Sequence, residues 1–272
     1  MRTNNCGLIK AHFCHKANFL IKQPQLTLIF PAYNEAGSIA NTLKEAVEYL
    51  NKRKISYEII VSADGTDGTR EIVTDIARAN PRIMGIGSVE RAGKGRGIRN
   101  AVAIARGKWI GFSDADNKTP ISELDKFIPF LEQGMEMAIG SRGGRLAHIE
   151  RRQPWYRRVG AKGFAFFMHV VTGLWEIVDT QCGFKFFQAE IARDLFSRQQ
   201  IDGYMYDVEI IFLAKKAGYR IAQVPIRWRD DGESRLQLVS GNIRNVGDVI
   251  SIPFRRYSPA VVKAPPEKVV LP

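Results

Sequence analysis

The stretch LTLIFPAYNE, residues 26 to 35, decides the fold because a short apolar run ends in a polar loop. The run LTLIF is rich in apolar and β-branched residues, which predicts a buried β-strand. A helical pattern follows from about residue 37 to 52. A strand, a loop and then a helix form the first half of a βαβ unit, the unit from which parallel sheets are built.

The same order recurs downstream. Further strands are predicted at YEIIV, RIMGIGS, KWIGFS and MEMAIGS, and further helices at about 69 to 79, 97 to 106 and 121 to 133. Strands that alternate with helices indicate an α/β fold with a mainly parallel sheet and helices on both faces. After residue 141 the same domain is elaborated by a basic, aromatic-rich stretch, DTQCGFKFF, a helical segment near 204 to 217, and the strand YRIAQVPIRW.

Polar, glycine-rich segments follow the first four predicted strands: PAYNE, SADGTDGT, ERAGKGRG and SDADNK. In open α/β sheets, ligands bind beyond the carboxyl ends of the strands. The four segments therefore predict one binding site at that edge of the sheet.

Asp114 and Asp116 lie one residue apart in SDADNK. In extended backbone, side chains at i and i+2 point to the same side, so both carboxylates can be presented together. Mg²⁺ and Mn²⁺ prefer oxygen ligands and are commonly held by one or two carboxylates, with substrate phosphates and water completing the shell. We therefore predict a divalent cation between this pair and a diphosphate.

The loop RAGKGRG carries Arg91, Lys94 and Arg96 among three glycines at the start of a predicted helix. This composition predicts a phosphate site made of backbone N–H groups and cations. The sequence Gly-x4-Gly-Lys-Ser/Thr is absent, which argues against ATP hydrolysis of the P-loop class.

The composition and net charge indicate which partners and which compartment to expect. The net charge of +12 suits nucleic acid, anionic lipid or a phosphorylated substrate, and three cysteines at unrelated spacings fit a reducing compartment, so we expect a cytoplasmic protein. We expect a flexible basic leader over residues 1–25, one domain over 26–257, and a flexible tail over 258–272. No run reaches the ~20 apolar residues of a spanning helix.

The motifs PAYNEAGSI, ADGTDGT, AGKGRGIRNAVAIARG and SDAD resemble the donor half of inverting family 2 glycosyltransferases, whose GT-A fold is Rossmann-like. The resemblance runs from about residue 26 to 236. DTQCGFKFF, YDVEIIFLAKKAGYRIAQVPIRW and GESRL are similar to the polyprenyl-phosphate branch of that family, and most similar to dolichyl-phosphate β-glucosyltransferases. It implies transfer of a hexose, glucose from UDP-glucose, to a polyprenyl phosphate with inversion.

The resemblance also implies roles for residues. Mg²⁺ or Mn²⁺ is assigned to Asp114 and Asp116, and the donor pocket to Pro31, Tyr33, Asn34, Glu35, Asp64, Lys94 and Asp114. The sequence departs from the family in two places. The usual consecutive aspartates of the second loop are replaced by Ala63 and Asp64, and Lys118 stands where mannosyl relatives often carry a glutamine ligand.

Catalytic roles are predicted for the second half of the chain. A polyprenyl monophosphate has a second pKa of about 6, so the nucleophile arrives deprotonated and mainly needs cationic neighbours. The candidates are Arg142, Arg229 and Arg235, together with Asp207 and Glu209. Asp179 lies in a motif that the family places near the acceptor or the sugar.

The segment from 142 to 175 combines arginines with aromatic residues and predicts a peripheral contact with anionic lipid on the cytoplasmic face of a membrane. An ordinary core helix with a solvated basic approach is the alternative. NVGDVISIPFRRY is a second candidate for the lipid contact, and a separate membrane-anchoring subunit is a further partner that we consider.

Three other functions stay open from the sequence. The first is the same class of enzyme with GDP-mannose or another sugar nucleotide as the donor. The base pocket around Asp64 is the feature that would distinguish these donors. The second is a basic nucleic-acid-binding protein, which we do not expect because no nucleic-acid motif accompanies the charge. The third is a catalytically inert regulatory subunit, which Ala63 and Lys118 make conceivable.

Overall fold

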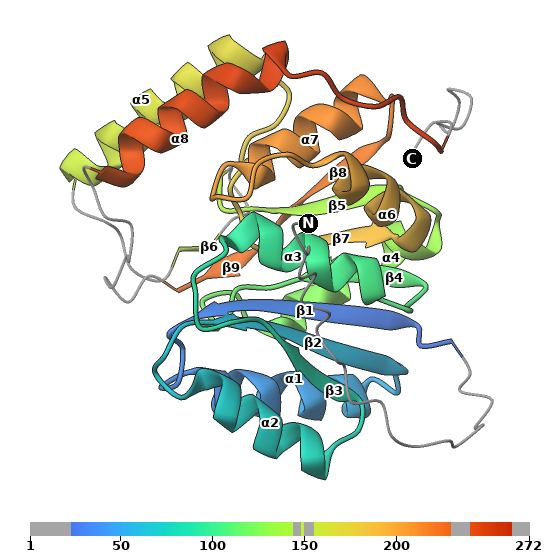
Figure 1. The fold of residues 1–272 in the computed structure, drawn as a ribbon. Coiled ribbons are helices and arrows are strands. Elements are labelled where there is room, and N and C mark those ends of the chain that lie inside the picture. Colours follow the sequence, from blue (N-terminus) through green and yellow to red (C-terminus); the bar gives the residue numbers. More distant parts are fainter. Residues whose placement is uncertain (1–22, 144–147, 150–154, 230–239, 263–272) are drawn as a thin grey trace, which may run out of the picture.

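The computed structural model describes residues 23–143, 148–149, 155–229 and 240–262. A seven-stranded sheet in the order β3-β2-β1-β4-β7-β5-β8 forms its centre (Figure 1). Its strands are β1 (Leu26–Tyr33), β2 (Tyr57–Asp64), β3 (Ile83–Ile86), β4 (Trp109–Phe112), β5 (Met137–Ser141), β7 (Lys185–Gln188) and β8 (Ile221–Pro225). A separate short ladder pairs β6 (His148–Ile149) with β9 (Arg227–Trp228).

The sheet is mainly parallel, as the sequence predicts. Only β7, among the strands of this sheet, runs antiparallel to its neighbours β4 and β5. The chain order reverses at β1, which pairs with β2 on one side and with β4 on the other. Such a reversal opens a crevice at the carboxyl ends of the strands, where ligands bind in α/β sheets.

The helices are α1 (Ile39–Lys52), α2 (Thr69–Ala79), α3 (Lys94–Ile104), α4 (Ile128–Glu132), α5 (Trp155–Thr172), α6 (Ala189–Arg198), α7 (Tyr206–Lys216) and α8 (Ser240–Ser251), with two 3₁₀ segments, η1 (Ile121–Lys126) and η2 (Ile252–Phe254). Helix α3 begins three residues before the predicted start at 97. The predicted helix 121–133 is divided into η1 and α4, because Pro129 has no N–H to continue the earlier turn.

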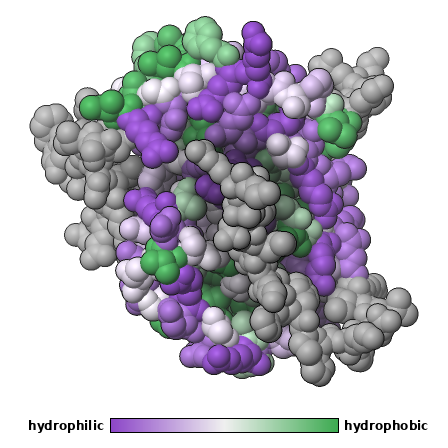
Figure 2. All heavy atoms as spheres, viewed as in Figure 1, coloured by the Kyte–Doolittle hydropathy of each residue, from purple (hydrophilic) through white to green (hydrophobic). Residues whose placement is uncertain are grey.

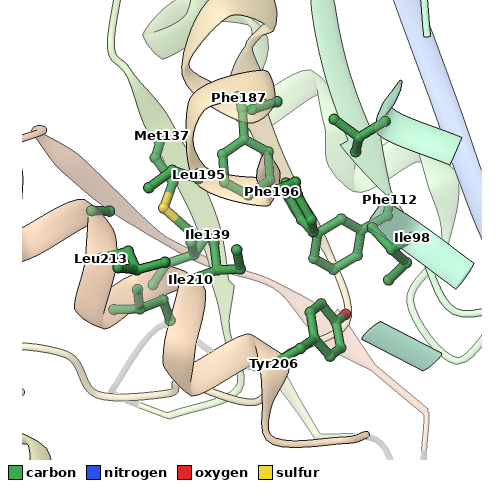
Figure 3. Close-up of a cluster of buried hydrophobic side chains, with 14 of the residues drawn as sticks. Ile98, Phe112, Met137, Ile139, Phe187, Leu195, Phe196, Tyr206, Ile210 and Leu213 are labelled. Carbon is green, nitrogen blue, oxygen red and sulfur yellow. The ribbon is translucent and has the colours of Figure 1, made fainter. Parts of the chain in front are cut away.

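Two cores lie on opposite faces of the sheet because side chains alternate along each strand. Leu28 and Phe30 of β1 pack against α1, α2 and η1, whereas Ile29 faces α3, α6 and α7. In the second core the rings of Phe112 and Tyr206 lie 5.9 Å apart between their centroids (Figure 3). The carboxyl ends of β1, β2 and β4 are thereby fixed between two packed layers.

Helices α5 and α8 pack side by side in an outer layer away from the sheet (Figure 1). Hydrophobic side chains gather on this layer at the top of the molecule (Figure 2). Phe166 of α5, Ile243 of α8 and Phe254 of η2 are 63%, 78% and 81% exposed. We call the exposed apolar side chains Phe166, Val170, Ile243, Ile250 and Phe254 the outer apolar face.

Candidate active site

The loops after β1 and β2 support each other at the edge of the sheet. Tyr33 pairs with Asp64 in the register of the two strands. Asn34 adopts a left-handed backbone with φ of 54°, and its side chain accepts a hydrogen bond of 3.2 Å from the Thr66 N–H. A Cβ at Gly65 would lie 2.1 Å from Asn34 Oδ1, so this contact requires glycine. Four of the predicted donor residues, Pro31, Tyr33, Asn34 and Asp64, therefore lie on adjoining segments.

Two acidic side chains of these loops are engaged by local donors. Asp64 accepts hydrogen bonds from the N–H groups of Ser88, at 3.2 Å, and Ala92, at 2.8 Å, so it holds the loop that follows β3. Glu35 accepts a 2.7 Å bond from the Ser38 hydroxyl at the start of α1. In this structure both carboxylates organise the loops around the crevice.

The glycine-rich loop places Lys94 at the site, but its backbone amides bind another loop of the protein instead of facing a phosphate site. The N–H groups of Gly95 and Arg96 donate to the carbonyl of Asp202 at 2.9 and 3.3 Å. These amides therefore hold a neighbouring loop, which corrects the expectation that they are exposed to phosphate. Nζ of Lys94 lies 2.6 Å from Oδ1 of Asp114. Burial works to lower the pKa of Lys94, but the charges of Asp114 and Asp207 outweigh it and raise that pKa.

Asp114 and Asp116 follow β4, whose last residue pairs with Ile29 of β1. Asp116 lies beside Lys118, with 3.3 Å between Oδ2 and Nζ. Burial and the charge of Asp114 raise the pKa of Asp116, although Lys118 opposes the shift. A second positive neighbour, which a divalent cation supplies, would stabilise the ionised form of Asp116.

The carboxylate pair fits a hard cation. Carboxylate oxygens suit Mg²⁺ and Mn²⁺. Within the described residues, no three His, Cys, Asp or Glu side chains are arranged to hold a metal ion. Two carboxylates with the remaining positions left to phosphate and water match the way Mg²⁺ is commonly bound.

Arg142 lies after β5 and is fixed by one carboxylate. Its Nε and NH2 donate to Asp179 at 2.8 and 3.0 Å, and its own N–H adds a third bond of 3.0 Å. Its guanidinium also lies 5.5 Å from the ring centroid of Trp228. This bidentate pair holds the guanidinium plane of Arg142 in one orientation.

Arg229 is brought to the metal loop through its backbone. Its N–H donates to the carbonyl of Lys118 at 2.9 Å, so the segment after β9 runs beside the loop of Asp116. Arg235, the third predicted arginine, lies outside the described residues.

Both acidic residues of α7 are buried, so neither is an exposed base. Asp207 is 3% exposed, and its Oδ1 lies 2.6 Å from Nζ of Lys185. Burial raises the pKa of Asp207, although the charges of Lys185 and Lys94 oppose it. Glu209 is fully buried and accepts hydrogen bonds from the N–H groups of Gln200 and Ile201 at 3.1 and 2.9 Å. The structure does not bring Glu209 together with the Lys94–Asp114 pair.

Sequence reasoning missed Lys185 and Tyr204. Lys185 is the only charged residue in GFKFF, and a lysine inside an apolar strand is a signal for a buried, paired cation. The Tyr204 hydroxyl accepts a 2.9 Å bond from Arg91, whose guanidinium also lies 4.3 Å from the Tyr33 ring centroid. No motif in the sequence indicates that Arg91, in the loop after β3, connects the end of β1 to the segment before α7.

Comparisons with known proteins agree with this geometry. Residues 27–196 match the model of the family described as Glycosyl transferase family 2. A dolichyl-phosphate beta-glucosyltransferase of Trichomonas vaginalis is 36% identical over 240 residues, which cover 83% of this chain and 70% of that protein. The dolichyl-phosphate beta-glucosyltransferase of Homo sapiens is 31% identical over 232 residues, 78% of this chain and 69% of that protein.

Solved structures show the same fold. Glucosyl-3-phosphoglycerate synthase from Mycobacterium tuberculosis, in complex with UDP, superposes with a TM-score of 0.61 at 20% identity, covering 84% of this chain and 80% of that one. The same enzyme in complex with Mn²⁺, UDP and glucosyl-3-phosphoglycerate gives a TM-score of 0.61 at 19% identity, covering 89% and 85%. The predicted GT-A architecture is confirmed.

Proposed function

Since this chain belongs to glycosyl transferase family 2, we propose that it transfers glucose from UDP-glucose to a dolichyl-type polyprenyl phosphate with inversion at the anomeric carbon. The names of its relatives support the sugar and the acceptor. The observation that carries the proposal is the contact between Lys94 and Asp114 at the crevice beside β1. It places a permanent cation against the carboxylate pair where a sugar nucleotide diphosphate would be held.

The reaction requires alignment and charge more than a base. An oxygen of the acceptor phosphate forms a bond to the anomeric carbon, while the bond from that carbon to the diphosphate breaks and UDP leaves with the electron pair. Attack on the face opposite the leaving group inverts the configuration. Because the phosphate arrives ionised, no protein group needs to remove a proton from it.

Different residues act on the donor diphosphate and on the acceptor phosphate. Lys94 neutralises charge on the leaving diphosphate, and Asp114 and Asp116 would hold Mg²⁺ or Mn²⁺ beside it. When bound, the cation supplies positive charge for the departing phosphate oxygens. Arg142, fixed by Asp179, and Arg229, beside the Lys118 carbonyl, orient the acceptor phosphate. Asp207 does not contact the substrates in this proposal; its buried ion pair with Lys185 supports the position of the surrounding residues.

A polyprenyl acceptor also requires contact with a bilayer, and we assign it to the outer apolar face. No helix among the described residues is long and apolar enough to span a membrane. Exposed Arg244 and Arg256 flank the apolar side chains of α8 and η2, a pattern suited to anionic lipid on the cytoplasmic face. This surface includes α5 of the predicted segment 142–175; residues 144–147 and 150–154 of that segment lie outside the described part.

The test is product analysis with matched substrates. Purified protein is incubated with UDP-glucose, GDP-mannose or UDP-galactose, and with a polyprenyl phosphate or the corresponding polyprenol. The expected product is glucosyl phosphoryl polyprenol from UDP-glucose alone. Glycosylation of the alcohol would overturn the acceptor, and preferred transfer from GDP-mannose would overturn the donor. A salt-sensitive shift of DNA or RNA without any sugar-nucleotide binding would favour the nucleic-acid hypothesis instead.

A further inference from the structure

We propose that residues 199–204, which lie in the connection between α6 and α7, form a bridge that positions the glycine-rich loop, and that Glu209 and Tyr257 are positioning residues for donor binding. We call residues 199–204 the bridge loop. The proposal rests on the proposed function only where it assigns Lys94 to the donor diphosphate. The bridge loop contacts two segments that are far apart in the sequence, one on each side.

On the donor side, the bridge loop carries the first turn of α3. The carbonyl of Asp202 accepts the N–H groups of Gly95 and Arg96, and its Oδ1 accepts a 2.7 Å bond from Arg99. A Cβ at Gly93 would lie 2.3 Å from the same carbonyl oxygen, so the two loops are in direct contact. Lys94 stands between these contacts, and its placement toward Asp114 depends on them.

On the other side, the bridge loop is held by the segment that follows η2. Glu209 binds the N–H groups of Gln200 and Ile201 with its carboxylate. Its Oε1 also accepts a 2.9 Å hydrogen bond from the Tyr257 hydroxyl. The side-chain amide of Gln200 donates to the Arg256 carbonyl at 2.7 Å. Residues 256 and 257 therefore anchor the start of the bridge loop.

These contacts satisfy the buried carboxyl group of Glu209, whose pKa is raised by burial and lowered in part by its hydrogen bonds. A buried carboxylate is costly unless each oxygen is hydrogen-bonded, and here two backbone amides and one hydroxyl satisfy it. If Tyr257 loses its hydroxyl, Glu209 loses a side-chain donor and the two backbone amides remain. The bridge loop then keeps its fold but has a less rigid support, and so does the turn that carries Lys94.

The experiment compares Tyr257→Phe with Tyr49→Phe. Both changes remove one tyrosine hydroxyl that donates to a carboxylate, at 2.9 Å to Glu209 and at 2.7 Å to Asp125. Tyr49 lies on α1, away from the bridge loop. Amide hydrogen exchange is followed in peptides covering 93–99 and 199–204, without any ligand. Dissociation constants for UDP with Mn²⁺ are measured by calorimetry.

We expect faster exchange in both peptides and an increase of about two- to tenfold in the UDP dissociation constant for Tyr257→Phe only. The KM for the lipid acceptor should stay unchanged, which separates positioning of the donor loop from a general loss of structure. Glu209→Gln should show the same pattern, because an amide cannot accept all three hydrogen bonds.

Unchanged exchange at 93–99 in Tyr257→Phe would overturn the bridge. Faster exchange with unaltered UDP affinity would overturn its role in donor binding. A wild-type protein that binds no uridine nucleotide would instead refute the proposed donor, and the exchange data would still decide whether the bridge exists.

Discussion

The ammonium group of Lys94 lies 2.6 Å from Oδ1 of Asp114, so one ion pair joins the first turn of α3 to the loop that follows β4. The two segments are 20 residues apart in sequence, and the rest of α3 and the whole of β4 lie between them. Their contact is made at the reversal of strand order beside β1. Any ligand that binds Asp114 is therefore also a neighbour of a fixed positive charge.

Asp116→Asn should keep the fold and reduce metal-dependent turnover by about two orders of magnitude. A neutral amide neither balances a divalent cation nor matches a carboxylate ligand. Initial rates measured across a Mn²⁺ titration, together with the melting temperature, test this expectation. Full activity in the variant, or in wild-type protein treated with chelator, would contradict it.

Gly183→Ala should reduce turnover because the new methyl group collides with the site. A Cβ at residue 183 would lie 2.1 Å from Oδ2 of Asp114, so the carboxylate must move and its contact with Lys94 must change. We expect a loss of about tenfold or more in kcat/KM, in line with the sensitivity of reactions to misplaced groups. Gly247→Ala is the matched control, since nothing lies within 4 Å of its Cβ position. Equal activity of both variants would refute the steric argument.

Asp179→Asn should lower stability at neutral pH and flatten the acid part of the stability profile. Burial works to raise the pKa of Asp179, but the charge and hydrogen bonds of Arg142 outweigh it and hold the pKa below the ordinary value of 3.8. A depressed folded-state pKa contributes stability above the unfolded value, and that contribution is lost as pH falls through the folded value.

We expect Asp179→Asn to cost about 1–3 kcal/mol at pH 7, less the solvent screening of the partly exposed Arg142. Urea unfolding of both proteins between pH 7 and pH 3.5 should show the difference shrinking below about pH 4. A difference that is constant over this range would indicate that the ionised carboxylate does not contribute.

The outer apolar face should bind vesicles that contain phosphatidylserine. Replacing Phe166 and Phe254 by serine removes two exposed aromatic rings and should release the protein from sedimenting vesicles. Binding should also weaken as salt rises, since each basic residue near the surface contributes about 1 kcal/mol. Ile104→Ser is the control, because this exposed side chain lies at the end of α3. Sedimentation that is unaltered by the double substitution would reject the surface.

Replacing the four arginines Arg151, Arg152, Arg157 and Arg158 by serine should reduce the same vesicle binding. Weaker binding of this variant to vesicles that contain phosphatidylserine, with unchanged binding to neutral vesicles, would identify the electrostatic part of the contact.

Arg229→Ala should damage transfer to the lipid phosphate more than it weakens donor binding. Its backbone is held beside Lys118, so the backbone of residue 229 stays near the site when the side chain is removed. Arg229→Lys keeps the charge but loses the two-pronged guanidinium, and partial rescue would show that charge contributes beyond geometry. The same series at Arg235 compares a residue outside the described part of the chain. An equal loss of UDP binding and transfer would contradict an acceptor role for Arg229.

The βαβ order of the first half could be predicted because apolar runs and helical periods are local signals. β1, β2, α1 and α2 all lie where the sequence places them, within a few residues. The second half has fewer such signals. β7 lies in DTQCGFKFF and pairs with β4, from which it is separated by the whole of α5, and nothing local in the sequence specifies that partner.

Some residues of the candidate site could be identified from the sequence and others could not. Asp114 and Lys94 could be identified because they follow predicted strands, and Tyr33 because PAYNEAGSI resembles a motif of the family. The roles of Asp202 and Glu209 could not, because they arise from backbone carbonyls and amides that meet only after folding. A helical carboxylate that binds the main-chain amides of a neighbouring loop looks identical, in sequence, to one that faces a substrate.

The antiparallel strand β7 sets an order of events for a chain that emerges from a ribosome. β1, β2, β3 and β4 have all left the exit tunnel before residue 185 appears, so β4 has one neighbour and an open hydrogen-bonding edge during that interval. Open edges pair readily with other chains, and distant pairings form slowly because a long loop must first close. The nascent first half, with its crevice already outlined, is therefore the stage at which the edge of β4 is open to pairing with another chain.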